Sequence, residues 1–155
     1  MNKPSPLKLF DRLSRLPLGR QLFTRGVCAT APYFGSIRPL VTELRVGRCV
    51  AELKQRRAVQ NHIGTVHAIA MCNLCELVAG LLIEATLPET LRWIPKGMTV
   101  RYLRKAKGDL RAVLDWQPQL PADFLGDVVL AVAVLDTQDQ RVMEADITMY
   151  VSPRR

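Results

Sequence analysis

Residues 61–67 read Asn-His-Ile-Gly-Thr-Val-His and lead directly into an apolar run that reaches Ile83. Between Val66 and Ile83 the only charged side chain is that of Glu76. The run is long enough for about five turns of helix, and a helix that is apolar nearly all round must be covered on most of its sides. A carboxylate inside such a helix is costly unless it is paired or used. The stretch therefore predicts a buried central helix with a functional acid, from about Thr65 as the N-cap to about Ala85.

Strand-like patterns flank this helix on both sides. Alternating apolar residues predict a hairpin over Ile37–Lys54 that turns at Gly47, and Pro88 and Pro95 bracket a loop after the helix. Four more strands are then predicted, over residues 98–102, 110–116, 128–135 and 142–151. The run 128–135 is continuously apolar, as a strand covered on both faces would be. The predicted fold class is α+β, with a long antiparallel sheet wrapped round one central helix.

Residues 1–31 are predicted to form a short helical N-terminal extension, and residues 32–155 the core of the same single domain. Apolar residues recur at helical spacing within the extension and are interrupted near residues 17–19 (Pro-Leu-Gly), which predicts two amphipathic helices. A targeting peptide is the alternative for a segment that is Arg-rich and acid-poor. We favour an integral extension because its apolar positions would cover a sheet edge.

The extension also carries most of the positive charge. Its six cations (Lys3, Lys8, Arg12, Arg15, Arg20 and Arg25) face one acid, Asp11, and so supply +5 of the net charge of +8. Such a balance is compatible with nucleic acid, an anionic membrane surface or a phosphorylated ligand. Aromatic residues make up only 6% of the chain and do not interleave with a basic stripe, so nucleic acid is disfavoured as a partner.

Cysteine usage and the apolar run each leave two interpretations. Four cysteines without a signal-peptide pattern predict reduced thiols and a cytoplasmic protein. Cys72 and Cys75 form a C-x-x-C inside the apolar helix without further ligands nearby, so we interpret them as packing residues and expect no metal site.

The apolar run could also span a membrane, but His67, Asn73 and Glu76 interrupt it and strands surround it. A buried helix is preferred.

His67 and Glu76 cannot meet within one chain. Nine positions separate them, which turns a helix by roughly 900° and places the two side chains on opposite faces, about 13 Å apart along the axis. If both residues serve one site, that site is formed by two chains.

The order of hairpin, buried helix and antiparallel meander, with N-x-x-G-x-x-H at the helix entrance, resembles the hotdog fold of acyl-CoA thioesterases. The resemblance is to the phenylacetate-pathway type and to a related branch of unknown function, and it covers residues 32–152. Asn61, Gly64 and His67 match the entrance motif, and Glu76 falls where that family places its catalytic Asp or Glu. Residues 101–108 look like the strand and turn that follow the active-site helix.

The resemblance implies a role for each matched residue. Glu76 would act as a base or a nucleophile, while the N–H groups around Ala68 in the partner chain would stabilise the oxyanion. Asn61 would orient the carbonyl or a water, His67 would be a hydrogen-bonding positioner, and Gly64 would serve the backbone conformation. Members of this family usually carry glycines directly after the histidine. Here Ala68 keeps the N–H, but its methyl group and the larger side chain at the next position leave less room for a substrate to approach that N–H.

Substrate contacts are expected from Thr65, Ile69, Asn73, Arg101, Arg104 and Lys105. The three cations would receive the phosphates of coenzyme A; the alternative is an ordinary solvated strand end. Hotdog dehydratases pair the histidine with an acid about fourteen positions later, where this chain has Leu81, so that chemistry is disfavoured.

The resemblance thus implies a thioesterase that acts on acyl-CoA or an acyl-carrier thioester, with no cofactor beyond coenzyme A as part of the substrate. A homodimer is expected, with a dimer of dimers as a further form. The alternative is a non-catalytic hotdog protein that binds an acyl-CoA-like ligand or a protein partner.

Overall fold

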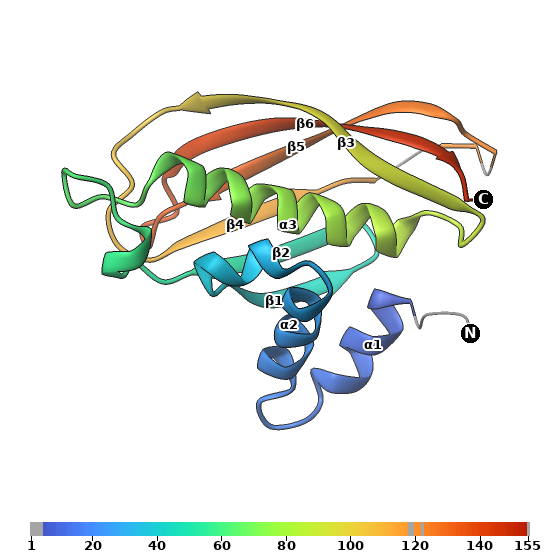
Figure 1. Ribbon diagram of the computed structural model, residues 1–155, viewed down its shortest axis with the longest axis horizontal. Helices are drawn as coiled ribbons and strands as arrows, with labels where there is room; N and C mark the ends of the chain where they lie inside the picture. The colour runs from blue at the N-terminus through green and yellow to red at the C-terminus, as the bar shows by residue number, and fades with distance from the viewer. Residues whose placement is uncertain (1–4, 118–119, 122, 155) are drawn as a thin grey trace.

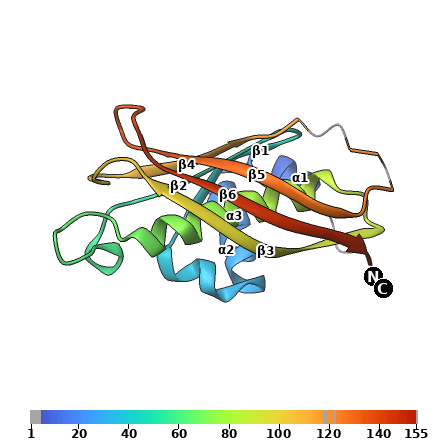
Figure 2. The same cartoon turned by 90° about the horizontal axis from the view of Figure 1, so that it is seen from above.

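One six-stranded antiparallel sheet forms the frame of the protein, with the strand order β1-β2-β4-β5-β6-β3. The computed structural model describes residues 5–117, 120–121 and 123–154 (Figure 1). The strands are β1 (Leu40–Arg45), β2 (Arg48–Leu53), β3 (Leu91–Tyr102), β4 (Leu110–Asp115), β5 (Gly126–Leu135) and β6 (Arg141–Pro153). The sheet curves along the long helix α3 (Ala68–Thr86), with β3 on one side of the helix and β1 on the other (Figures 1 and 2). The predicted fold class is confirmed.

Helix α3 lies in the core. From Ala70 to Ile83 every residue is buried except Cys72 and Glu76, which are half-buried. The helix is long and apolar enough to meet the criteria for a membrane span, yet 61% of that window is buried inside the protein. Its apolar sides pack against the inner face of the sheet, as a core helix requires.

Two strands differ from the sequence prediction. The loop after α3 ends at Thr90, and β3 runs on through Pro95, which was predicted to bracket that loop. Proline is tolerated here because β3 is an edge strand and its register shifts between Pro95 and Gly97. In β5, burial alternates, and Val129 is 57% exposed. The continuous apolar run therefore covers a strand with only one buried face in the single chain.

The extension consists of α1 (Pro6–Leu13), α2 (Gly19–Thr30) and the short 3-10 helix η1 (Pro32–Ile37). Phe10 and Phe23 meet edge to face, with ring centroids 5.1 Å apart, and both belong to the main core cluster. The hydroxyl of Thr24 in α2 accepts a hydrogen bond from the backbone N–H of Val41 in β1, at 3.0 Å. Helix α2 thus covers the β1 edge of the sheet, as the sequence predicts for the extension.

Candidate active site

The loop before α3 is held together by Asn61. Its side-chain oxygen accepts hydrogen bonds from the backbone N–H groups of Ile63 and Thr65, both at 3.1 Å, and its amide donates to the Thr65 hydroxyl at 2.8 Å. Gly64 has a φ of +75°, which glycine adopts readily and other residues rarely do. The conformation of the loop is thus sufficient to explain why Asn61 and Gly64 occupy their positions in the motif. A role for Asn61 toward a substrate stays a prediction.

His67 is the N-cap of α3. Its Nδ1 accepts a hydrogen bond from the backbone N–H of Ile69 at 3.1 Å. The neutral ring therefore carries its proton on Nε2. The sequence placed the cap at Thr65, which is wrong because the hydroxyl of Thr65 is engaged by Asn61 and the chain stays extended for two more residues. His67 thus caps the helix itself, and its role as a hydrogen-bonding positioner in the site stays a prediction.

The cap leaves two donors at the helix start. The first turn of a helix has N–H groups without intrahelical partners; here Ile69 donates to the His67 ring, and Met71 to the His67 carbonyl at 3.3 Å. Within residues 5–117 and the other described ranges, the N–H groups of Ala68 and Ala70 have no acceptor. Two backbone donors at the positive end of α3 are thus available to an anion.

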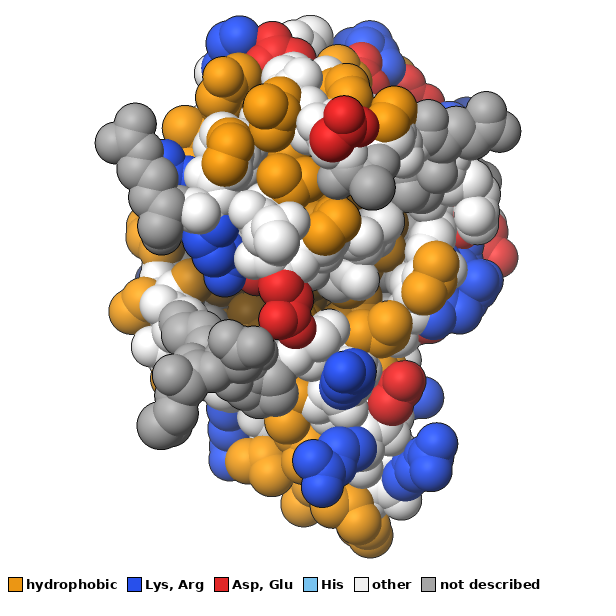
Figure 3. Space-filling view, turned by 90° about the vertical axis from the view of Figure 1, so that its right-hand side faces the viewer, with side chains coloured by type: hydrophobic (Ala, Val, Ile, Leu, Met, Phe, Trp, Pro, Cys, Tyr) orange, Lys and Arg blue, Asp and Glu red, His pale blue; other side chains and the backbone are white. Residues whose placement is uncertain are grey.

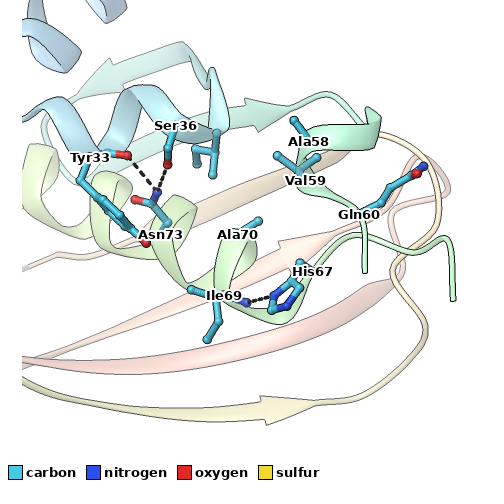
Figure 4. Close-up of a pocket in the computed structure, with 10 residues that line it drawn as sticks. Tyr33, Ser36, Ala58, Val59, Gln60, His67, Ile69, Ala70 and Asn73 are labelled. Carbon is cyan, nitrogen blue, oxygen red and sulfur yellow. Dashed lines mark hydrogen bonds between the residues drawn. The ribbon is translucent and has the colours of Figure 1, made fainter. Parts of the chain in front are cut away.

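A pocket of about 200 Å³ lies beside this helix start (Figure 4). It is lined by His67, Ile69, Ala70 and Asn73 of the α3 region, by residues 58–60, and by Tyr33, Ser36 and Ile37 of η1. The amide of buried Asn73 donates to the Tyr33 carbonyl and the Ser36 hydroxyl, both at 3.3 Å. Three predicted site residues, His67, Ile69 and Asn73, are thus brought together in one chain.

Glu76 lies on another side of α3, along β3. Cys72, Glu76 and Gly80 are spaced by four residues and share one stripe of the helix. The Cys72 sulfur is 4.0 Å from the Tyr102 hydroxyl at one end of β3, and a Cβ on Gly80 would come within 2.8 Å of the Trp93 ring near the other end. Glu76 therefore faces the middle of β3, the free edge strand of the sheet.

The carboxylate of Glu76 is half-buried and forms no hydrogen bond or ion pair with any residue that the structure describes. The other acid of α3, Glu84, accepts a hydrogen bond from the Trp93 indole at 2.7 Å and pairs with Arg154 at 3.1 Å. Glu76 is also absent from the residues that line the pocket at the helix start. A single chain thus keeps the acid apart from the helix entrance, as the nine-residue spacing predicts.

The three predicted phosphate ligands are placed differently from one another. Arg101 is exposed and pairs with Glu144 and Asp146 of β6, at 3.2 and 3.1 Å. Arg104 donates to the side chain of Gln140. Lys105 has no partner among the described residues, and it lies next to Ala106, whose carbonyl accepts from the Val66 N–H at 2.8 Å. Of the three cations, Lys105 is both close to the helix entrance and uncommitted.

The cysteines on α3 are thiols. Burial raises the pKa of Cys72, and burial raises that of Cys75 further. Both groups are protonated near neutral pH, so neither is an activated nucleophile. Sequence reasoning did not identify Tyr33 and Ser36 of η1 or Tyr102 of β3. These residues are 30 to 40 positions from their α3 partners, and no local motif predicts such contacts.

Residues 19–151 match the model of a protein family described as a domain of unknown function, DUF4442. The chain belongs to this family. Among curated proteins, none matches the sequence. A solved structural-genomics target, APC5556, is 44% identical with a TM-score of 0.83, and the match covers 95% of this chain and 97% of that one.

Other solved structures share the architecture and carry thioesterase names. PA5026 of Pseudomonas aeruginosa, a probable thioesterase, is 25% identical with a TM-score of 0.71, over 90% of this chain and 97% of that one. A hypothetical thioesterase of Streptococcus pneumoniae, crystallised with coenzyme A, is 21% identical with a TM-score of 0.64, over 76% and 91% of the two chains. The hotdog fold is thereby confirmed, together with the relation to thioesterases of this superfamily and to a branch of unknown function.

Proposed function

We propose that this protein hydrolyses acyl-CoA thioesters at a site shared by two copies of the chain. The supporting observation is the position of Glu76, a carboxylate without a partner among the described residues, beside the free edge strand of the sheet. In the proposed dimer, the helix entrance of the second copy lies across that edge. It then brings the N–H groups of Ala68 and Ala70 toward the acid of the first copy.

The surface around Glu76 supports pairing of two copies. Side chains near the open face of α3 and along β3 are strongly exposed: Tyr33 (71%), Ile69 (55%), Ile94 (58%) and Tyr102 (56%). An edge strand with exposed apolar side chains readily pairs with another strand, and two copies related by a twofold axis would cover both edges at once. Light scattering should report at least a dimer at micromolar concentration. A monomer would contradict the shared site.

The proposed chemistry follows from the groups on each side of the interface. The Glu76 carboxylate takes a proton from water while the water oxygen attacks the thioester carbonyl carbon. The charge that develops on the carbonyl oxygen is stabilised by the N–H of Ala68 at the positive end of α3. The tetrahedral intermediate then breaks its C–S bond, and the leaving thiolate takes the proton that Glu76 received, which restores the carboxylate. Direct attack by Glu76, which forms an anhydride that water later hydrolyses, uses the same geometry.

Coenzyme A is the thiol that the surroundings favour. Lys105, beside the helix entrance, and the neighbouring exposed Lys107 present positive charge close to the proposed site. Phosphate groups are attracted to such side chains. Arg101 makes a smaller contribution in this proposal because Glu144 and Asp146 already neutralise it.

The decisive variant is Glu76→Gln, which keeps the size of the side chain and removes its basicity. Hydrolysis of a panel of acyl-CoA esters, followed by released thiol, should fall by roughly 10²–10⁴-fold. The matched control is Glu84→Gln on the same helix, since that acid serves the contacts with Trp93 and Arg154; its turnover should stay close to the wild type. Absence of wild-type hydrolysis on every ester, with coenzyme A still bound, would support the non-catalytic alternative.

A further inference from the structure

The turn between α1 and α2 exposes three leucines at one end of the molecule. Leu16, Leu18 and Leu22 are 57%, 73% and 58% exposed. The turn lies at the far end of the helical hairpin, away from the sheet (Figure 1). Single exposed leucines are common on protein surfaces, but three within seven residues at a protruding tip form an apolar patch that the fold does not use.

The backbone holds this patch in a fixed conformation. Leu18 has a φ of +58°, a left-handed conformation that costs a leucine about 1 kcal/mol or more. The two helices approach closely, because a Cβ on Gly19 would lie 1.7 Å from the Leu13 carbonyl oxygen. Hydrogen bonds from Leu16 to Leu13 and from Gly19 to Leu16, at 2.8 and 3.0 Å, close the turn. A strained residue with an exposed apolar side chain indicates a role other than stability.

The helical hairpin that carries the three leucines also carries uncommitted positive charge. The exposed cations of the hairpin are Lys8, Arg12, Arg15, Arg20 and Arg25, and its one acid is Asp11. None of these five cations forms an ion pair with a described residue, whereas Arg48, Arg101 and Arg111 in the sheet all do. Figure 3 shows the lysine and arginine side chains gathered with apolar ones over the lower end of the molecule, which α1 and α2 form.

We propose that the α1–α2 tip docks on an anionic lipid bilayer. The leucines would enter the boundary between headgroups and acyl chains, and the surrounding cations would meet lipid phosphates. Phe10 and Phe23 anchor the hairpin in the core, so the patch is presented as a rigid unit. A positively charged tip with exposed leucines matches an anionic bilayer, because its headgroups are negatively charged and its acyl chains are apolar. A second copy of this chain would instead bring like charges together at the tip.

The test is cosedimentation of the full chain, without substrate, with vesicles of phosphatidylglycerol and phosphatidylcholine or of phosphatidylcholine alone. The wild type should bind the anionic vesicles and stay in solution with the neutral ones, and added salt should weaken binding. The triple variant Leu16→Ser, Leu18→Asn, Leu22→Ser should bind at least roughly tenfold more weakly. Asn tolerates the left-handed backbone at residue 18, so the fold should persist.

The matched control is Leu125→Asn, which removes a leucine that is 53% exposed elsewhere and should bind like the wild type. Replacing Arg12, Arg15 and Arg20 with Gln should also weaken binding by roughly tenfold or more, because each cation near an anionic surface contributes. The proposal is overturned if the wild type ignores anionic vesicles or if the leucine variant binds them equally well. A lower mass of the leucine variant in light scattering would overturn it in favour of a second copy.

Discussion

One edge strand of the sheet, β1, is covered by a helix, whereas the other, β3, is free. At β1, helix α2 lies against the strand, and Thr24 accepts the hydrogen bond that Val41 would otherwise offer outward. At β3, no described residue pairs along the outer side between Trp93 and Tyr102. The only unpartnered acid of α3, Glu76, faces this second edge. The extension closes one edge and leaves the other free, and in the proposed dimer a second copy completes the sheet and the site at that free edge.

Among the substitutions that test the two edges, the largest effect is expected at the helix entrance that would meet the β3 edge. Ala68→Pro removes the N–H proposed as the oxyanion donor and should lower kcat by roughly 10²–10³-fold. Proline is favoured at the first position of a helix, and His67 has a ψ of 138°, which suits a residue before proline. The helix should therefore persist. Circular dichroism checks the fold, and unchanged kcat would remove Ala68 from the mechanism.

Pairing through β3 can be broken by proline as well. In an antiparallel edge strand, neighbouring residues direct their N–H groups alternately toward the sheet and away from it. Of Thr99→Pro and Val100→Pro, one should remove a bond to β6 and lower stability, while the other should keep the fold and abolish the dimer in light scattering. If both variants fold and remain dimeric, the dimer does not use this edge.

A Thr→Val substitution at the covered β1 edge should lower the stability of the protein, whereas the same substitution on the free β3 edge should not. Thr24→Val keeps the shape of the side chain but leaves the buried N–H of Val41 without its acceptor, which should lower the free energy of unfolding by about 1–3 kcal/mol. Thr99→Val on exposed β3 is the matched control and should change it by less than about 0.5 kcal/mol. Urea unfolding measures both. Equal losses would show that α2 does not protect β1 through this bond.

The smallest effect concerns charge at the β1–β2 hairpin. Hydrogen bonding and ion pairing, first with Arg45 and then with Arg48, lower the pKa of Glu43. The stability that comes from a lowered pKa is fully present above the ordinary glutamate value of about 4.3, and it is lost as the pH falls through the lower pKa of the folded protein. Because solvent screens these ion pairs, Glu43→Gln should cost less than about 1 kcal/mol at pH 7 and clearly less at pH 3. A loss that is equal at both pH values would contradict the ion-pair explanation.

Much of this architecture follows from local patterns in the sequence. The apolar run predicts α3 because Glu76 is its only charged residue over five turns, and the interruption at residues 17–19 predicts two helices in the extension. The boundaries that were missed depend on tertiary context. Pro95 lies inside a strand because that strand is an edge with a shifted register. The helix begins at Ala68 because Asn61 engages the hydroxyl of Thr65, which therefore cannot cap it.

The site is only partly predictable for the same reason. Helical spacing is sufficient to separate His67 from Glu76, and the motif locates the helix entrance. The partners Tyr33 and Ser36 are not encoded in any short motif, because they reach Asn73 through a turn nearly 40 residues earlier. Sequence alone does not distinguish Arg101, Arg104 and Lys105 as phosphate ligands. In the structure, the neighbouring strand β6 supplies two carboxylates to Arg101, whereas Lys105 has no partner among the described residues.

Complementation between two inactive variants tests the shared site most directly. Glu76→Gln and Ala68→Pro chains would be unfolded together, refolded and assayed for acyl-CoA hydrolysis beside each variant alone. In a mixed dimer, one of the two sites combines an intact acid with an intact helix entrance. Random pairing should therefore restore about a quarter of the wild-type activity from two chains that each have almost none. If the mixture is no more active than the separate variants while mixed dimers form, the acid and the entrance do not meet across an interface.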